Sequence, residues 1–319
     1  MSLDHPVVSA LLPVVLLIAI GWVAGRARLV RGEGVRDLSN LVFLVLTQAL
    51  LFRTMSAVHI ERIDFGSVAL YYAVAAALFI VTLLAQGLHA RSAVVALAAI
   101  FSNTLMIGVP LVGLAYGEAG LVQLFTLISL HALVLLTFAT VVLELLVARE
   151  DARAGTAAPR HLLATVGQAV KNAVLHPVPL PILAGLAYAQ TGLGLHPVVD
   201  RPLKLLGDAF GPVALVLVGV TLSQTAIGAH LRGALVISAL KTVLHPLLMA
   251  AAGWTLGLRG LPLAVMVVAA ALPVGANVFL FSQRYRQAEE LVTASVAVST
   301  VFAIASVTVV MAWLPRLTG

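Results

Sequence analysis

The sequence predicts an all-α polytopic membrane protein with about ten transmembrane helices, arranged as two inverted five-helix repeats. Of the 319 residues, 61% are hydrophobic and 10% are charged, whereas roughly a quarter of the residues in a soluble domain are charged. The mean hydropathy is +1.08. A polar stretch near mid-chain separates the apolar blocks into two sets. These observations place the chain in a bilayer and divide it into halves.

The apolar blocks have the length of about 20 residues that a helix needs to cross a bilayer. Short charged or Gly- and Pro-containing breaks separate them. Asp4 and the absence of Lys or Arg before the first block favour a retained helix over a cleaved signal peptide. The predicted spans are Pro6–Gly25, Val35–Val58, Phe65–Leu88, Ser92–Tyr116, Glu118–Val147, Gly167–Gln190, Leu203–Gln224, Leu231–Leu256, Pro262–Phe281 and Ala288–Leu314.

The basic residues behind the net charge of +6 are divided unevenly between the two sides of the predicted spans. Most Lys and Arg residues, including Arg26, Arg28 and Arg153, fall in loops on one side of the predicted spans. By the positive-inside rule both termini then lie on the non-cytoplasmic side of the inner (cytoplasmic) membrane. A nucleic-acid partner is not expected, because the chain lacks a basic soluble face. Cysteine is absent, so we expect neither a disulfide framework nor a thiolate metal site.

The stretch "AREDARAGTAAPRH", Ala148 to His161, is typical of a solvated cytoplasmic loop. It divides the chain into a first repeat at residues 1–148, a loop at 149–165 and a second repeat at 166–319. Each half holds five predicted spans. Because five is odd, the second half enters the membrane with the opposite orientation, which is the geometry of an inverted repeat.

The fourth span of each half is interrupted. "FSNTLMIGVPLVG" carries Asn103, Gly108 and Pro110, and "ALPVGANVFLFSQRY" carries Pro273, Gly275 and Asn277. Proline removes a backbone donor, and glycine permits conformations that other residues resist. Paired interruptions in two halves indicate a transporter binding site. Packing kinks are the alternative explanation, which is less favoured for two matching helices than for one.

Two helices broken near the bilayer midplane favour an anionic ligand. Each break exposes backbone groups that need a partner at membrane depth, and helix N-termini carry partial positive charge. Asn103 and Asn277 add side-chain donors and acceptors. We therefore expect a small organic anion, in particular a carboxylate, to bind there.

The chain resembles the auxin efflux carrier family, which includes plant PIN carriers and bacterial malonate-transporter-like proteins. The resemblance covers essentially the whole chain and rests on "SNTLMIGVPLV", "KNAVLHPVPLPILAGL", "LKTVLHPLL" and "LPVGANVFLFSQRY". It implies a ten-helix inverted-repeat fold, a scaffold domain, a transport domain that moves as an elevator, and a homodimer. It also implies that the crossing fourth and ninth helices hold the substrate carboxylate.

Carried over by residue, the resemblance places Asn103 and Pro110 in one crossing and Pro273 and Asn277 in the other. Two departures put the substrate in doubt more than the fold. In the second helix, family members often have a proline before the "ALLF" motif, whereas "LTQALLF" has none. At the start of the sixth helix, His176–Pro177 stands where the family usually has an asparagine-proline pair.

Each of the further polar residues in the predicted spans has two possible roles. Gln48 and Gln224 are candidate cavity residues, or they form interhelical hydrogen bonds. Ser299 and Thr300 are candidates for substrate or sodium contact, although hydroxyls in such helices usually bond to their own backbone.

The titratable residues also have more than one possible role each. His131 suits proton coupling or a structural hydrogen bond. Lys241 lies one turn before His245 and attracts the anion, pairs with a carboxylate, or snorkels toward the cytoplasm. Glu144 is a candidate partner or coupling carboxylate, or a solvated helix-end residue.

The sequence therefore predicts a secondary carrier of a small mono- or dicarboxylate such as malonate, with no cofactor and with proton or sodium as candidate coupling ions. No enzyme motif occurs. One alternative is a sodium-coupled symporter of the bile-acid type. A second is a channel or a non-transporting membrane assembly factor.

Overall fold

The computed structural model describes residues 6–58, 60–62, 64–153, 163, 167–168, 170–171, 178–225 and 228–314. This part of the chain is helical, with one isolated β-bridge and no strand, which confirms the predicted all-α class. The first half contains α1 (Pro6–Arg26), α2 (Gly32–Leu41), η1 (Val42–Leu46), α3 (Thr47–Met55), η2 (Ile60–Arg62), α4 (Phe65–Gln86), α5 (Ala90–Ala98), η3 (Thr104–Gly108) and α6 (Val109–Arg153). The second half contains α8 (Pro179–Ala189), α9 (Pro197–Gln224), η4 (Gly228–His230), α10 (Leu231–Ala239), η5 (Leu240–Leu244), α11 (His245–Thr255), α12 (Gly260–Ala271), α13 (Asn277–Tyr285) and α14 (Glu289–Trp313).

Six helical stretches in the described part are long and apolar enough to cross a membrane: Glu33–Met55, Phe65–Gln86, Thr104–Arg153, Pro197–Gln224, Leu231–Thr255 and Glu289–Trp313. Three shorter helical stretches are apolar as well: Leu11–Arg26, Pro179–Ala189 and Gly260–Ala271. The chain therefore has the helices of a multi-pass membrane protein. The expected total of about ten crossings stays a prediction.

Local sequence explains where several helices begin and turn. The Asp64 carboxylate accepts hydrogen bonds from the N–H groups of Gly66 and Ser67 at 2.9 and 3.2 Å and so caps α4. Gly117, at φ 61° and ψ −155°, breaks the helical path within α6, at the boundary predicted between the fourth and fifth spans. Beyond it the helix continues to Arg153, into the first residues of the predicted loop. The rest of that loop lies almost wholly outside the described residues.

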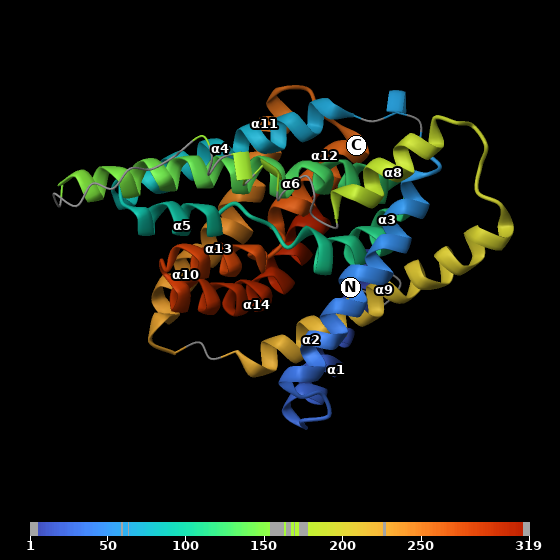
Figure 1. Ribbon diagram of the computed structural model, residues 1–319, viewed down its shortest axis with the longest axis horizontal. Helices are drawn as coiled ribbons and strands as arrows, with labels where there is room; N and C mark the ends of the chain where they lie inside the picture. Colours follow the sequence, from blue (N-terminus) through green and yellow to red (C-terminus); the bar gives the residue numbers. More distant parts are fainter. Residues whose placement is uncertain are drawn as a thin grey trace.

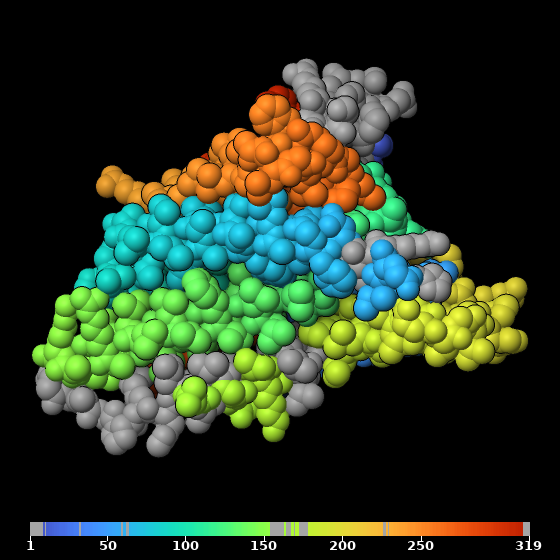
Figure 2. All heavy atoms as spheres, turned by 90° about the horizontal axis from the view of Figure 1, so that it is seen from above, coloured from blue at the N-terminus to red at the C-terminus, as the bar shows by residue number. Residues whose placement is uncertain are grey.

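The helices form two groups that lie side by side (Figure 1). In the first group, α1 and α2 pack along α9, and α3 packs against both α8 and α9. The second group contains α4, α5, α6 and α10 to α14. Its members α10 and α14 pack together. On the face seen in Figure 2, α4 lies between α6 and the α11–α12 pair, and α12 also packs directly on α6.

Glycine allows the closest helix approach in the first group. A Cβ atom built on Gly21 of α1 would lie 2.0 Å from the carbonyl oxygen of Val216, and one on Gly219 of α9 would lie 2.0 Å from that of Ile18. Backbone therefore meets backbone in this pair, the arrangement that small residues permit between membrane helices.

Candidate functional site

The two interrupted helices meet where each of them is broken. The segment between α5 and η3 lies antiparallel to the segment between α12 and α13, with Ser102 opposite Val274. The N–H of Asn103 donates to the carbonyl of Pro273, and the N–H of Gly275 donates to the carbonyl of Phe101, both at 2.9 Å. Each broken segment thus provides hydrogen-bond partners for backbone groups of the other. We call these two segments the crossing.

Side chains satisfy further backbone groups at the crossing. In an unbroken helix the N–H of Val274 would bond to the carbonyl of Ala270. Here Val274 donates instead to the hydroxyl of Ser299 at 3.0 Å, and the carbonyl of Ala270 accepts from Nζ of Lys241. The hydroxyl groups of Tyr71 and Ser102 are 2.9 Å apart and share a hydrogen bond. Buried polar groups at a helix break are expected to find such partners.

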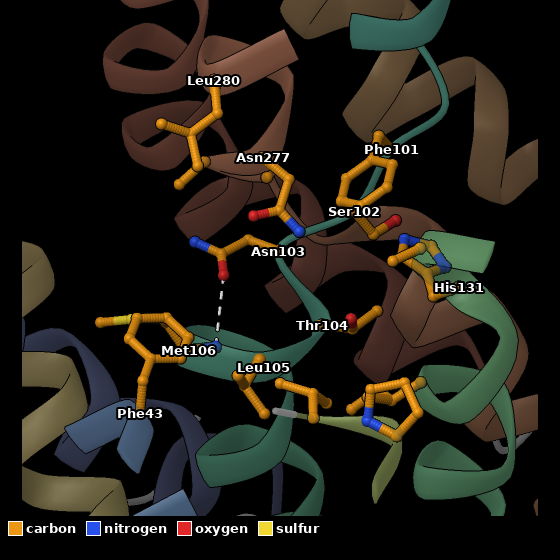
Figure 3. Close-up of a pocket in the computed structure, with 16 residues that line it drawn as sticks. Phe43, Phe101, Ser102, Asn103, Thr104, Leu105, Met106, His131, Asn277 and Leu280 are labelled. Carbon is orange, nitrogen blue, oxygen red and sulfur yellow. Dashed lines mark hydrogen bonds between the residues drawn. The ribbon is translucent and has the colours of Figure 1, made fainter. Parts of the chain in front are cut away.

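Two helices begin at the crossing. Asn103 is the N-cap of η3, and its Oδ1 accepts from the N–H of Met106 at 3.2 Å. Asn277 is the first residue of α13, which has no side-chain cap. The amide groups of Asn103 and Asn277 lie close to one another at the same cavity (Figure 3). Partial positive charge from two helix N-termini is therefore directed to one place.

The cavity has a volume of about 260 Å³, slightly below the range of about 300–1,000 Å³ that is usual for drug-sized ligands. Its polar lining comes from Ser102, Asn103, Thr104, His131 and Asn277. Its apolar lining includes Phe43, Phe101, Met106 and Leu280. No Lys or Arg of the described chain lines it. Backbone N–H groups, amides, hydroxyls and one imidazole are therefore the kinds of polar group that line the cavity.

Both helix groups contribute to the cavity. Phe43 of η1, Val178 and Pro179 belong to the first group or to the start of its helix α8, whereas the crossing belongs to the second. The cavity therefore lies at the boundary between the groups.

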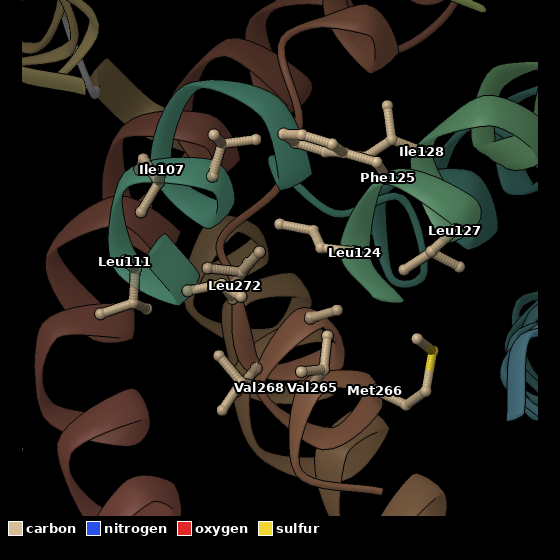
Figure 4. Close-up of a cluster of buried hydrophobic side chains, with 14 of the residues drawn as sticks. Ile107, Leu111, Leu124, Phe125, Leu127, Ile128, Val265, Met266, Val268 and Leu272 are labelled. Carbon is tan, nitrogen blue, oxygen red and sulfur yellow. The ribbon is translucent and has the colours of Figure 1, made fainter. Parts of the chain in front are cut away.

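A layer of buried apolar side chains supports the crossing. Ile107, Leu111 and Leu272 lie together near the broken ends, with Leu124 and Val268 beside them (Figure 4). Residues Leu263 to Leu272 are all buried, as expected for a helix in the centre of a bundle. Core side chains packed in this way fix the broken ends in one geometry.

Four of the predicted binding residues line the cavity or its rim: Asn103, Gly275, Asn277 and His131. Gly108 does not line it; a Cβ there would lie 2.7 Å from Cδ1 of Leu272, so this glycine lets the broken helices pass closely. Pro273 supplies the carbonyl that Asn103 uses.

Pro110 is buried in the first turn of α6, away from the cavity. A Cβ built on Gly211 of α9 would lie 3.6 Å from Cβ of Pro110. Pro110 therefore contacts the first helix group. Because α6 continues directly from η3 in the helical stretch Thr104–Arg153, the missing N–H of Pro110 removes a hydrogen bond from the helix just after the break.

The remaining candidates are dispersed. Nε2 of Gln48 donates to the carbonyl of Phe43 in its own helix at 2.9 Å. Gln224 is exposed at the end of α9. The Thr300 hydroxyl bonds to the carbonyl of Val296 at 2.7 Å, and Glu144 is half-buried beside Tyr285. His176–Pro177 lies outside the described residues.

Lys241 and His245 are fully buried beside the crossing. Lys241 therefore does not snorkel to an aqueous surface, and that interpretation of the sequence is wrong. Neither residue lines the cavity.

Sequence reasoning missed Tyr71 and the direct role of Ser299 at the break. Tyr71 was visible as a polar hydroxyl in an apolar span, but the adjacent Tyr72 offered the same signal. Only the packing of α4 on the crossing distinguishes them, because Tyr72 donates instead to the carbonyl of Leu127 at 2.7 Å.

Comparisons with known proteins agree with this architecture. Residues 6–311 match the family model described as "Membrane transport protein". A protein of Rhizobium meliloti (strain 1021) named "Putative malonate transporter" is 29% identical over 320 residues, which cover 95% of this chain and 94% of that protein.

Two plant proteins match over shorter stretches. "Auxin efflux carrier component 8" of Arabidopsis thaliana is 23% identical over 234 residues, covering 62% of this chain and 64% of that protein. "Auxin efflux carrier component 3a" of Oryza sativa subsp. japonica is 35% identical over 109 residues, covering 32% and 18%. With the family model spanning nearly the whole chain, the protein belongs to the membrane transport protein family of auxin efflux carriers and is a multi-pass membrane transporter, not an enzyme.

Proposed function

We propose that this protein is a secondary active transporter of a small organic anion, a mono- or dicarboxylate such as malonate. The observation that carries the proposal is the convergence of two helix N-termini and two asparagine amides on one cavity of about 260 Å³. A carboxylate has acceptor lone pairs and no donors, so it matches a site rich in N–H groups. The name of the Rhizobium meliloti relative supports malonate as the first substrate to test.

The lining also suits reversible binding. A carrier must release its substrate on the far side of the membrane in every cycle. A buried Arg–carboxylate pair would hold the anion by strong, bidentate hydrogen bonds. Backbone N–H groups and neutral amides bind more weakly, which favours exchange.

Elevator-type alternating access is the mechanism we propose. The group that contains the crossing would slide against the group of α1, α2, α3, α8 and α9, carrying the anion with it. The position of the cavity between the two groups supports this motion, because sliding would expose the cavity to each side in turn. The two halves, 1–148 and 166–319, would be the inverted repeats, and the protein would form a homodimer.

The test is counterflow of labelled malonate into proteoliposomes preloaded with unlabelled malonate. We expect saturable uptake by the wild type and loss of saturable uptake in Asn103→Ala and Asn277→Ala. Asn40→Ala is the matched control, since Asn40 is exposed on α2. Thermal unfolding of each purified variant checks that it is folded.

Normal kinetics in both site variants would refute the assignment of the site. The alternatives have their own outcomes in the same assay. Uptake that requires a sodium gradient would favour the bile-acid-type symporter. Flux without saturation or counterflow would indicate a channel, and no flux with any organic anion would indicate an assembly factor.

A further inference from the structure

Three basic side chains lie in the protein interior next to the crossing: Lys241 on η5, His245 on α11 and His131 on α6. We call them the basic cluster. Lys241 and His245 are 0% exposed and His131 is 3% exposed. The rings of His131 and His245 both lie within 6.0 Å of the Tyr71 ring, and Lys241 is one helical turn before His245. His131 lines the cavity of the crossing, so the cluster reaches from the cavity into the core.

The basic cluster lacks the partners that buried charges normally have. Lys241 donates to the carbonyl of Ala270, and none of the ion pairs formed within the described residues includes it. In the same part of the chain, the ring nitrogens of His245 have no hydrogen-bond partner, and His131 lies against the backbone of Ser102 and not against an acid. A buried charge without a counter-charge is costly. A positive charge on this cluster therefore needs an anion that the cluster itself does not contain.

The surroundings of the cluster supply no such anion. Tyr71 and Tyr72 are the titratable groups of α4 that face it, with the Tyr71 ring 5.3 Å from His245 and 6.0 Å from His131. α12 carries no titratable residue. The acids of α14, Glu289 and Glu290, lie in its first turn, where Glu290 pairs with His230 of η4 at 2.9 Å.

α10, which also packs on η5, contributes Arg232, which is exposed. Among the elements that pack on η5, α10, α11 and α12 carry no acid, and the two acids of α14 lie in its first turn.

From this juxtaposition we propose that the basic cluster binds one proton together with the carboxylate, so that the protein is a proton–carboxylate symporter that needs no sodium. The inference rests on the proposed carboxylate transport and adds its coupling ion. An anion in the cavity provides the counter-charge that the cluster lacks, and the protonated cluster stabilises the anion in return. Each ligand thereby favours the binding of the other.

The step balances in atoms and charge. A hydronium ion on the side where the carboxylate enters gives up the proton, so one O–H bond breaks as one N–H bond forms on the cluster. On the far side that bond breaks and the proton returns to water with the departing anion. A monocarboxylate then crosses with no net charge, and a dicarboxylate crosses with one net negative charge. The empty carrier returns without the proton.

The test uses purified full-length protein in sodium-free proteoliposomes that contain the pH dye pyranine, with the membrane potential clamped by potassium and valinomycin. External malonate should acidify the lumen of wild-type vesicles and leave protein-free vesicles unchanged. An acid-outside pH gradient should drive malonate accumulation, and a sodium gradient should not. Counterflow at equal pH, measured in parallel, reports carboxylate transport without net proton movement.

Lys241→Met is the informative variant because Lys241 lies outside the cavity lining. We expect slower counterflow than in the wild type, because the substitution also leaves the carbonyl of Ala270 without its donor. Each malonate that still crosses should carry no proton, so the ratio of acidification to malonate uptake should fall to zero. Lys204→Met is the control, since Lys204 is exposed and pairs with Asp208 at 2.7 Å. If Lys241→Met does not fold, His245→Gln replaces it.

Wild-type counterflow without acidification would overturn the proton coupling and leave the carboxylate carrier standing. A ratio of acidification to malonate uptake at the wild-type level in Lys241→Met would overturn the role of the cluster. Absence of wild-type counterflow across a panel of organic anions would overturn the proposed function and this inference with it.

Discussion

At the scale of single residues, the broken helix depends on side chains that replace its missing backbone partners. Ser299 accepts the N–H of Val274, and the site is fully buried. Ser299→Ala would leave this N–H unsatisfied, which costs about 1–3 kcal/mol. We expect a lower midpoint of thermal unfolding in detergent and slower malonate counterflow.

Ser295→Ala is the matched control for that experiment. Ser295 lies on the same helix and is equally buried, but its hydroxyl bonds to the carbonyl of Leu291 in its own helix. Removing this hydroxyl leaves no backbone N–H group without a hydrogen-bond partner. Equal destabilisation by the two substitutions would contradict the role given to Ser299.

The residues of the crossing were predictable because they violate the pattern around them. Asn103, Gly275 and Asn277 interrupt apolar runs, and the structure brings all three to one cavity. The sequence offers no comparable signal for the partner of a residue. Whether Lys241 faces water or the carbonyl of Ala270 depends on tertiary packing, which hydropathy does not encode.

At the scale of helices, the α1–α9 pair is held by backbone contact at glycines. In Gly21→Ala the new methyl group would lie 2.0 Å from a backbone oxygen of Val216, so the helices must separate. Overpacking of this kind costs about 1–3 kcal/mol. A fall in the thermal unfolding midpoint is the expected result.

Gly113→Ala provides the comparison. A Cβ at Gly113 meets only the Leu121 side chain, at 3.7 Å, and alanine is favoured over glycine within a helix by up to about 1 kcal/mol. Its stability should be unchanged or higher. If Gly21→Ala is as stable as Gly113→Ala, close packing does not hold the α1–α9 pair.

Hydropathy located the start of some helices and missed the start of others. α4 begins at Phe65, as predicted. α9 begins at Pro197 instead of the predicted Leu203, because His196 caps it and Pro197 starts it. A hydropathy pattern reports the apolar part of a helix, whereas capping and proline decide where its backbone starts.

At the scale of the whole molecule, the arrangement of the helices joins distant parts of the chain at one site. Residues from η1, the α5–η3 segment, α6, the start of α8 and the α12–α13 segment line the same cavity. The broken spans were evident in the sequence, and the motif of paired breaks indicated that they meet. The contribution of Phe43 and Pro179 was not evident, because apolar side chains on a membrane helix look alike whether they face lipid or a cavity.

The orientation of the molecule in the membrane gives the last prediction. The positive-inside rule places the loop after α1 in the cytoplasm and the loop between α8 and α9 on the opposite side. Leu29 and Leu193 lie in these loops and are 78% and 77% exposed. The chain has no cysteine, so Leu29→Cys and Leu193→Cys each introduce one unique label site. A membrane-impermeant maleimide applied to intact cells should label Leu193→Cys and should label Leu29→Cys only after permeabilisation. The reverse pattern would invert the topology, and labelling of both in intact cells would mean that the number of crossings between these loops is even, against the five that two inverted repeats require.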